Sequence, residues 1–379
     1  MRLRRRKRAD ESAWRAVRRC VVFFATICVV PVLLVLIVTT DSYMRPVRQT
    51  AFVRPQFEHV ERHEANLHNL TAVEKRLERR RLHLRKACKY LGLNVPGNDS
   101  LHKPDPWEFL IDVKHRLVWC NVFKAASTSW MYNFNILAGY SPKFLKKSKV
   151  VPLVLARQKY PRPTLQILRK AFNNSVSFLI TRHPFERLLS AYKDKLLFAL
   201  PHTYHRKLGS EIISKYRPKV KNQKGFKPEK WPTFPEFVLY LLDSVKQNQN
   251  LDMHWTPITE FCTPCMFDFD IIAHTETLQE DQQYLIKKAH LEGLVEPQWR
   301  NAGHGATARQ IRKYYSQLTR SQILQLYHIY RYDFELFNYS LKGYLELGQP
   351  DDDPSTLLAA ITLKDFPQNK DNPMPQLYR

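Results

Sequence analysis

Apolar and polar residues alternate along this chain in short blocks with two different spacings. Mainly apolar runs at Leu117–Val122, Ser175–Thr181 and Asp270–His274 predict three buried strands. Segments with helical spacing follow or separate these runs, at Ser127–Ala138, Pro163–Phe172, Pro184–Leu200, Phe234–Lys246 and from about Glu276 onward. This order predicts an α/β fold with a mainly parallel sheet flanked by helices.

The last strong helical pattern opens at a capping box, Thr319-Arg-Ser-Gln322. Its apolar residues share one helix face: Ile323, Leu326, Tyr330, Phe334 and Phe337. After about Gly348 the chain is acidic and rich in proline, which predicts a disordered tail over residues 348–379.

The N-terminus has the pattern of a membrane anchor. Residues 1–19 hold nine basic and two acidic side chains, and Cys20–Thr40 is uncharged and long enough to cross a bilayer. A cleaved signal peptide is the alternative, but its apolar region would be shorter and would end at a small-residue cleavage site. We expect a cytoplasmic tail over 1–19 and a signal anchor over 20–40, with the rest of the chain lumenal.

A charged stem is predicted over residues 41–104. Residues 41–56 are aperiodic, as in a linker, and Phe57–Leu91 is helical and strongly charged. Its leucines have the spacing of an interrupted heptad seam: Leu67, Leu70, Leu77 and Leu84. A solvated helix is one interpretation, and a short coil that forms a homodimer is the other. The turn-rich segment Asn94–Pro106 marks the boundary to a lumenal domain over 105–347.

The positive charge calls for an acidic partner. Of the net charge of +25, seven positive charges lie in residues 1–19 and 18 lie beyond them. In the secretory lumen the expected polyanions are glycosaminoglycans or anionic lipids, and not nucleic acid. Basic segments that could line an acceptor groove are Lys143–Lys149, Arg157–Arg169 and Arg206–Lys230, and a stem cluster is formed by Lys75, Arg76, Arg79, Arg80, Arg81, Arg85, Lys86 and Lys89. Four glycosylation sequons, at Asn69, Asn98, Asn173 and Asn338, agree with lumenal exposure.

Six cysteines are present, two of them in the predicted anchor. The other four allow three disulfide connectivities: Cys88, Cys120, Cys262 and Cys265. Cys262-Thr-Pro-Cys265 also has the spacing of half a zinc site, but no second Cys/His pair stands at a suitable distance. We therefore expect structural disulfides and no metal.

The stretch "NVFKAASTSW" leads from a predicted strand directly into a predicted helix. The first amides of a helix are unpaired and bind anions, and small side chains let an anion approach them. The stretch lacks the glycines of a Walker loop and its lysine comes first, so a magnesium–nucleotide site is disfavoured. A buried turn with incidental hydroxyls is the alternative. The candidate anion-binding residues are Phe123, Lys124, Ala125, Ala126, Ser127, Thr128 and Ser129.

A second stretch, "TRHPFERLLSAYKDK", is a candidate for another phosphate site. Arg182 stands where the second strand ends, at the edge where α/β sheets bind ligands, and Ser190 lies in the following helix. An ion pair between Arg187 and a neighbouring carboxylate is the alternative role for that arginine. The candidates here are Arg182, His183, Pro184, Phe185, Glu186, Arg187, Leu188, Leu189 and Ser190.

Together these stretches resemble the membrane-bound Golgi carbohydrate sulfotransferases, in the family that contains the chondroitin and dermatan 4-O-sulfotransferases and the HNK-1 sulfotransferase. The resemblance covers about Lys114 to Leu347 and includes three further blocks, His254–Cys265, His274–Asp281 and Tyr332–Ser340. It implies a P-loop-like sulfotransferase fold. The chain departs from the usual family residues at Phe123, Ser127, Ser129 and His183.

The resemblance also implies a chemistry. The donor is 3′-phosphoadenosine 5′-phosphosulfate, with Lys124 beside its bridging oxygen and with Arg182 and Ser190 at its 3′-phosphate. His254 is our candidate general base, and His183, His274 and Glu276 are weaker ones. The implied location is the Golgi membrane in type II orientation, and the implied acceptor is the 4-hydroxyl of N-acetylgalactosamine in chondroitin or dermatan. Terminal N-acetylgalactosamine or glucuronate on glycoproteins is an alternative, as is a non-catalytic glycosaminoglycan-binding protein.

Overall fold

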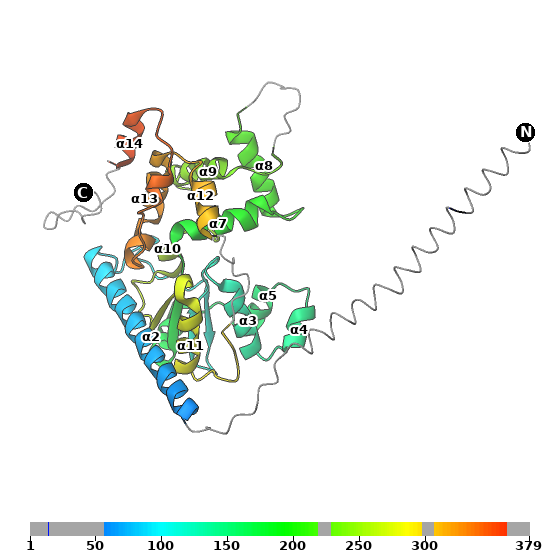
Figure 1. Ribbon diagram of the computed structural model, residues 1–379, viewed down its shortest axis with the longest axis vertical. Coiled ribbons are helices and arrows are strands. Elements are labelled where there is room, and N and C mark those ends of the chain that lie inside the picture. Colours follow the sequence, from blue (N-terminus) through cyan, green and yellow to red (C-terminus); the bar gives the residue numbers. More distant parts are fainter. Residues whose placement is uncertain (1–13, 15–56, 219–228, 298–306, 362–379) are drawn as a thin grey trace, which may run out of the picture. The chain divides into compact units, whose positions relative to one another are not determined.

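The computed structural model describes residue 14 and residues 57–218, 229–297 and 307–361 (Figure 1). The chain divides into two compact units, Met1–Glu64 and Ala65–Arg379. Except for residues 57–64 of α2, all elements discussed below belong to the second unit. The predicted anchor at 20–40, the linker at 41–56 and the end of the acidic tail lie outside the described residues. No helix within those residues combines the length and apolar character that crossing a membrane requires.

The core of the fold is a four-stranded sheet with the order β1-β2-β3-β4. Its strands are β1 (Phe109–Asp112), β2 (Leu117–Cys120), β3 (Val176–Thr181) and β4 (Ile271–His274). β2, β3 and β4 pair in parallel, which confirms the predicted sheet, and β1 pairs with β2 in antiparallel orientation. The pattern did not predict β1, an edge strand that pairs with β2. The carboxyl ends of β2, β3 and β4 share one edge, where Thr181 is in register with His274.

Two groups of helices surround this sheet. Figure 1 shows α2 to the left of the sheet, α11 overlapping the strands in this view, and α3, α4 and α5 on the right, with α7, α8, α9, α12 and α13 above the sheet. The bounds are α2 (Phe57–Tyr90), α3 (Ser127–Leu137), α4 (Pro142–Lys147), α5 (Pro152–Lys159), α6 (Leu165–Asn174), α7 (Pro184–Tyr192), α8 (Tyr204–Tyr216), α9 (Phe234–Lys246), α10 (Ile258–Cys262), α11 (Leu278–Lys288), α12 (Thr307–Tyr315), α13 (Arg320–Leu336) and α14 (Pro354–Ile361). Short 3-10 helices span Thr275–Thr277 and Leu345–Leu347.

Two hydrophobic clusters result, and α7 connects them. The first contains the sheet with Trp119, Trp130 and Phe178, and the second contains the inner faces of the upper helices. α7 begins just after β3 and buries Phe185 and Leu188 in the second cluster. The edge of the sheet therefore lies where the two clusters meet, which fixes the β2–α3 loop against α7.

The helix expected as a solvated stem packs instead on the core of its own chain. Val73, Leu77 and Leu84 of α2 are only 2–4% exposed and belong to the sheet cluster. Arg76 and Arg80 both pair with Asp281 of α11 at 2.7 Å. Because this packing occupies Leu77 and Leu84, the part of the leucine seam that the structure describes from Val73 onward is not available for a coiled coil.

The disulfides are Cys88–Cys265 and Cys120–Cys262. The first joins the end of α2 to the loop after α10, and the second joins β2 to α10. The sequence left three connectivities open, and the fold selects one. Both cysteines of the CxxC segment are oxidised, so the half-zinc interpretation is wrong.

Several helix ends differ from the predicted ones. The helix expected over Pro184–Leu200 is α-helical only to Tyr192 and continues as a π-helix over Lys193–Leu197. The capping box at Thr319 is confirmed by both of its hydrogen bonds. The expectation of a disordered tail is wrong for its first part, because Asp351 accepts the N–H of Ser321 and α14 packs on α13, where His328 bonds the carbonyl of Ala360 at 2.8 Å.

Candidate active site

The β2–α3 loop has an unusual backbone for a segment without glycine. Lys124 and Ala126 both have left-handed φ values, 69° and 58°, which side chains other than glycine adopt rarely. Ala126 caps α3 without a side-chain hydrogen bond, and the first helical amides to find a carbonyl are those of Ser129 and Trp130. In the described part of the chain no acceptor receives the N–H groups of Ser127 and Thr128. This loop therefore presents free amides at a helix N-terminus, as anion sites do.

The side chains of the loop divide into two groups. Ser127 is half-buried and Thr128 exposed, so both hydroxyls can reach a ligand. Ala125 and Ser129 are buried and face the protein. Of the three predicted hydroxyl donors, two remain accessible.

Lys124 forms an ion pair with Asp194 of the π-helix. Lys195 holds the same carboxylate at 3.2 Å. Burial lowers the pKa of Lys124, and the hydrogen bond with Asp194 offsets part of that effect. The ammonium is thus a partly desolvated charge, in a setting where electrostatic interactions are stronger than in water.

Arg182 links the two predicted phosphate stretches. Its Nη1 donates to the carbonyl of Lys124 at 3.4 Å, and its Nε and Nη2 donate to Glu186 at 3.4 Å. Ser190 lies one turn beyond Glu186 on α7 and is half-buried. Because residues four apart share a helix face, Glu186 and Ser190 lie on the same side of α7.

Arg187 has a different position from the one the sequence suggested. It is 1% exposed, and its guanidinium donates to the carbonyls of Phe123 at 2.9 Å, Thr256 at 2.7 Å and Met253 at 3.5 Å. The expected alternative, an ion pair with a carboxylate, is not formed among the described residues. Phe185, Leu188 and Leu189 are also buried, in the second hydrophobic cluster. The side chains of these four residues hold the site together and do not face a ligand.

His254 belongs to a hydrogen-bonded chain of three side chains. Its Nδ1 lies 2.6 Å from Oδ1 of Asp252, and Nε2 of His205, in the first turn of α8, lies 3.1 Å from Oδ2. An ionised carboxylate only accepts, so both histidines donate to it and Nε2 of His254 keeps its lone pair. Burial lowers the pKa of His254, with Asp252 offsetting part of the effect. Burial alone would raise the pKa of Asp252, but the hydrogen bonds from His205 and His254 hold it well below its ordinary value.

Within the described residues this is also the group whose donor atoms are close enough to hold a metal ion, all within 4.8 Å of one another. The carboxylate lies between the two rings and accepts from each, which is the geometry of a positioned base. The donor loop lies beside this group, since the rings of Phe123 and His254 are 4.9 Å apart. Phe123, one of the departures from the family pattern, thus brings Lys124 next to His254.

The weaker base candidates lie elsewhere. Nδ1 of His183 accepts the N–H of Phe185 at 3.3 Å, and Nε2 donates to the carbonyl of Ser340 at 3.1 Å, so both ring nitrogens are used. Burial lowers its pKa to about 4. His183 therefore caps α7 together with Pro184. The ring of His274 lies 5.0 Å from that of Tyr339, whose hydroxyl donates to Glu276 at 3.4 Å.

Sequence reasoning missed Asp252, His205 and Asp194. The spacing Asp252-x-His254 was a usable signal, because an aspartate two residues before a histidine can reach its Nδ1. No local signal indicates His205 or Asp194, which come from α8 and the π-helix. Tertiary packing brings them to the site.

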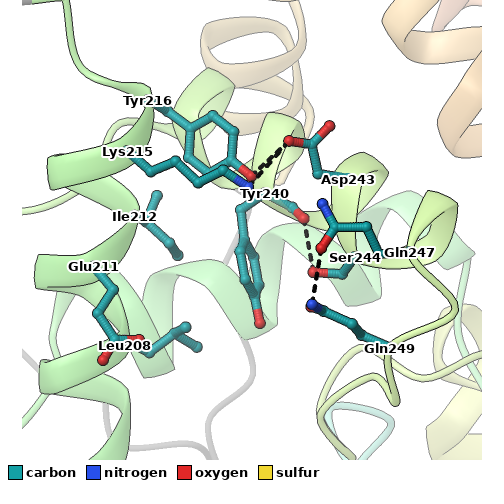
Figure 2. A pocket seen from close by; sticks show the side chains of 10 residues that line it. All are labelled: Leu208, Glu211, Ile212, Lys215, Tyr216, Tyr240, Asp243, Ser244, Gln247 and Gln249. Carbon is teal, nitrogen blue, oxygen red and sulfur yellow. Dashed lines mark hydrogen bonds and ion pairs between the residues drawn. The ribbon is translucent and has the colours of Figure 1, made fainter.

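A hollow between α8 and α9 lies apart from this site (Figure 2). Figure 2 shows Tyr216 and Lys215 directed at Asp243, another residue that lines the hollow. Its volume is about 160 Å³, below the range of pockets for drug-sized ligands. None of the predicted donor residues lines it.

The family model and the curated relatives that match this chain indicate the same family. The model of the "Sulfotransferase family" matches residues 107–340. Carbohydrate sulfotransferase 11 of Rattus norvegicus is 29% identical over 245 residues, covering 63% of this chain and 68% of that protein. Carbohydrate sulfotransferase 9 of Homo sapiens is 29% identical over 279 residues, or 70% and 60% of the two chains, and carbohydrate sulfotransferase 10 of Xenopus laevis is 28% identical over 275 residues, or 69% and 76%. No solved structure matches the chain.

Proposed function

Because this chain belongs to the sulfotransferase family and is a carbohydrate sulfotransferase, we propose that it moves a sulfuryl group to the 4-hydroxyl of N-acetylgalactosamine in chondroitin or dermatan. One observation carries the proposed site. Arg187 bonds the carbonyl of Phe123, next to Lys124, and the carbonyls on both sides of His254. A charged group suited to the donor and a neutral base suited to the acceptor therefore share one edge of the sheet.

The family implies 3′-phosphoadenosine 5′-phosphosulfate as the sulfate donor. We assign the 5′-phosphate to the free amides of Ser127 and Thr128 and to their hydroxyls. Arg182 and Ser190 would bind the 3′-phosphate. The fit is supported by the uncapped N-terminus of α3 and by the position of Arg182, whose Nη1 already contacts the backbone of Lys124.

Lys124 would stabilise the negative charge that develops on the leaving oxygen during transfer. A fixed ammonium in a partly buried site is preorganised for that charge and needs little reorganisation when it forms. In the described structure its partner is Asp194. When the donor binds, the Lys124 ammonium would give up part of its contact with Asp194 and bind the donor instead.

His254 would accept the proton of the sugar hydroxyl at Nε2. Asp252 positions the ring through Nδ1 and stabilises the imidazolium that forms, while His205 holds the second oxygen of Asp252. The low pKa of His254 keeps the ring neutral and ready to accept a proton near neutral pH.

The choice of acceptor rests on charge. The three relatives reported above are 28–29% identical to this chain, so identity does not separate their acceptors. The excess of 18 positive charges beyond residue 19 favours a polyanionic chain over a neutral glycan terminus. Terminal N-acetylgalactosamine or glucuronate on glycoproteins remains the second candidate.

We place the enzyme in the Golgi membrane with the catalytic unit in the lumen. The uncharged segment Cys20–Thr40 behind a basic tail supports the anchor. The two disulfides support an oxidising compartment. Epitope accessibility at each terminus in selectively permeabilised cells tests this orientation.

The activity test is transfer of labelled sulfate by the full chain to a panel of acceptors. The panel contains desulfated chondroitin, desulfated dermatan and glycoproteins ending in N-acetylgalactosamine or glucuronate. Disaccharide analysis of the product identifies the sulfated carbon. Label at carbon 4 of N-acetylgalactosamine in the polymers supports the proposal, and label only on the glycoproteins selects the second candidate.

A further inference from the structure

A second cavity, of about 320 Å³, lies beside α2 and contains none of the residues assigned to the donor. We call it the α2 pocket. Its lining is partly basic, with Arg76, Arg79, Arg80 and two histidines, and partly apolar, with Ile272, Leu336 and Phe337. Its volume lies at the lower end of the range for ligand pockets. An anionic group attached to a ring or a short apolar surface fits such a lining.

Two buried polar atoms in this lining have no hydrogen-bond partner among the residues that the structure describes. They are Nε of Arg76 and Nε2 of His274, and both are hydrogen-bond donors when the histidine is in its Nε2–H form. Burial lowers the pKa of His274 to about 3, so its ring is neutral. Buried polar groups are nearly always satisfied in folded proteins, which indicates that an acceptor from outside the chain belongs here.

The described carboxylates do not balance the positive charge of the pocket. Arg76 and Arg80 share Asp281 at 2.7 Å, and Arg76 also pairs with Glu280 at 2.7 Å. Arg79 is exposed and pairs with no carboxylate in the described part of the chain. One positive charge at the mouth of the pocket is therefore left for a ligand.

The pocket continues into a basic face of α2. Lys75, Arg79, Lys86 and Lys89 are exposed, and no described carboxylate pairs with them. Their spacings of four, seven and three residues place them on one side of the helix over about 21 Å. Arg81 and Arg85 differ, because both pair with Asp268 on another side of the helix. The structure thus separates the basic cluster of the sequence into structural arginines and a linear set of free cations.

We infer that the α2 pocket and this basic face form a second binding site for an anionic glycan, separate from the reacting sugar. One sulfate or carboxylate enters the pocket, and further anionic groups along the glycan contact Lys75, Lys86 and Lys89. The inference rests on the proposed function insofar as the glycan is the acceptor chain. A linear row of charges beside a recessed pocket matches a linear polymer with repeated charges, whereas a membrane surface would contact only exposed groups.

Two matched double variants test the site. Arg79→Ser/Lys86→Ser removes two unpaired charges from the proposed face, and Arg81→Ser/Arg85→Ser removes two charges of the same helix that are paired with Asp268. The full chain without substitutions is the parent of both variants. Retention on immobilised chondroitin sulfate in a salt gradient measures binding without any requirement for catalysis.

We expect the first variant to elute at lower salt and to raise KM for polymeric acceptor about 10-fold, as the loss of two surface contacts to a polyanion predicts. Its kcat, and its kcat/KM for a tetrasaccharide acceptor, should stay unchanged. An equal fall of the elution salt in both variants would show an effect of net charge only, and it would overturn the proposed second site. Loss of binding to phosphatidylserine vesicles with unchanged glycan retention would overturn the glycan in favour of a membrane.

The pocket itself is tested through the ring signal of His274 in protein with isotope-labelled histidine. Addition of a chondroitin sulfate oligosaccharide should shift that signal in the parent and less in Arg79→Ser/Lys86→Ser. An unmoved signal during saturable retention would overturn the role of the pocket. If the parent transfers no sulfate to any acceptor, the proposed function fails, while retention and the His274 signal still decide the second site.

Discussion

Nδ1 of His254 lies 2.6 Å from Oδ1 of Asp252, and the other oxygen of that carboxylate is held by His205. The carboxylate fixes which nitrogen of His254 carries the proton and leaves Nε2 directed away from it. The ring of Phe123 lies against the other side of this arrangement and carries the Lys124 loop. The same packed group of side chains therefore positions both the proposed base, His254, and the loop that holds Lys124.

Replacing Asp252 with Asn should lower kcat about 100-fold, because the ring loses the charge that stabilises its protonated form. Asp252 raises the pKa of His254, so the variant should also shift the acidic limb of the rate profile to lower pH. Donor affinity should stay within about twofold, since the substitution does not touch the residues assigned to the donor. His205→Gln should have a smaller effect on kcat. A loss of rate without any shift of the acidic limb would mean that Asp252 is only structural.

The pH dependence of kcat/KM should be bell-shaped. His254 must be neutral, so activity is lost as pH falls through its pKa, which burial places below the ordinary 6.5. Lys124 must be charged, so activity is lost as pH rises through its pKa, which burial places below the ordinary 10.5. Initial rates at subsaturating acceptor from pH 4 to 11 measure both limbs. An acidic midpoint above the ordinary value of histidine would exclude His254 as the base.

Lys124→Ala should lower kcat at least about 100-fold, the range found when a preorganised electrostatic contact to developing charge is removed. Because Lys124 is not in either hydrophobic cluster, the melting temperature should change little. The exposed Lys170 on α6 provides the control, and Lys170→Ala should leave the rate unchanged. Near-normal turnover of a folded Lys124→Ala protein would refute the role of this lysine.

The two arginines of the second stretch should respond differently to alanine. Arg182→Ala should weaken donor binding about 10-fold or more with little loss of stability, because Arg182 is partly exposed and its protein contacts are long. Arg187→Ala should lower the free energy of unfolding by about 3–5 kcal/mol, because three backbone carbonyls lose a buried donor. Calorimetric titration of the donor and urea unfolding separate the two effects. Equal changes of donor affinity and of the free energy of unfolding in both variants would contradict these different roles.

The disulfides should contribute strongly to stability. Cys88→Ser/Cys265→Ser opens a link between residues 177 positions apart and should cost about 2–5 kcal/mol. Because this link ties α2 to the sheet unit, limited proteolysis should then cut near residue 90 first. Peptide mapping of the unreduced protein checks the pairing directly. Recovery of a Cys88–Cys120 or Cys88–Cys262 peptide would refute it.

The sheet and its main helices could be predicted because their signal is local. The apolar runs that become β2, β3 and β4 are continuous, and the capping box at Thr319 lies within four residues. β1 and α14 were missed for the opposite reason. β1 is an edge strand defined by its pairing with β2, and α14 is ordered by contacts with α13 that lie outside its own sequence.

The candidate site was only partly predictable for the same physical reason. Lys124, Arg182 and His254 could be selected because each stands at a recognisable point of a motif. The role of Arg187 as a buried link could not be read from its motif, since its three acceptors are backbone atoms far away in the chain. Asp194 and His205 become relevant only through helices that fold over the edge of the sheet.

By itself the sequence determined the α/β order, the two anion-binding stretches and the family, because hydrophobic period and short motifs are encoded in neighbouring residues. The tertiary structure decided the disulfide pairing, the partners of His254 and Lys124, and the division of the α2 arginines into paired and free ones. These depend on distances between segments far apart in the chain. A linear pattern does not contain such distances, and packing of the two hydrophobic clusters sets them.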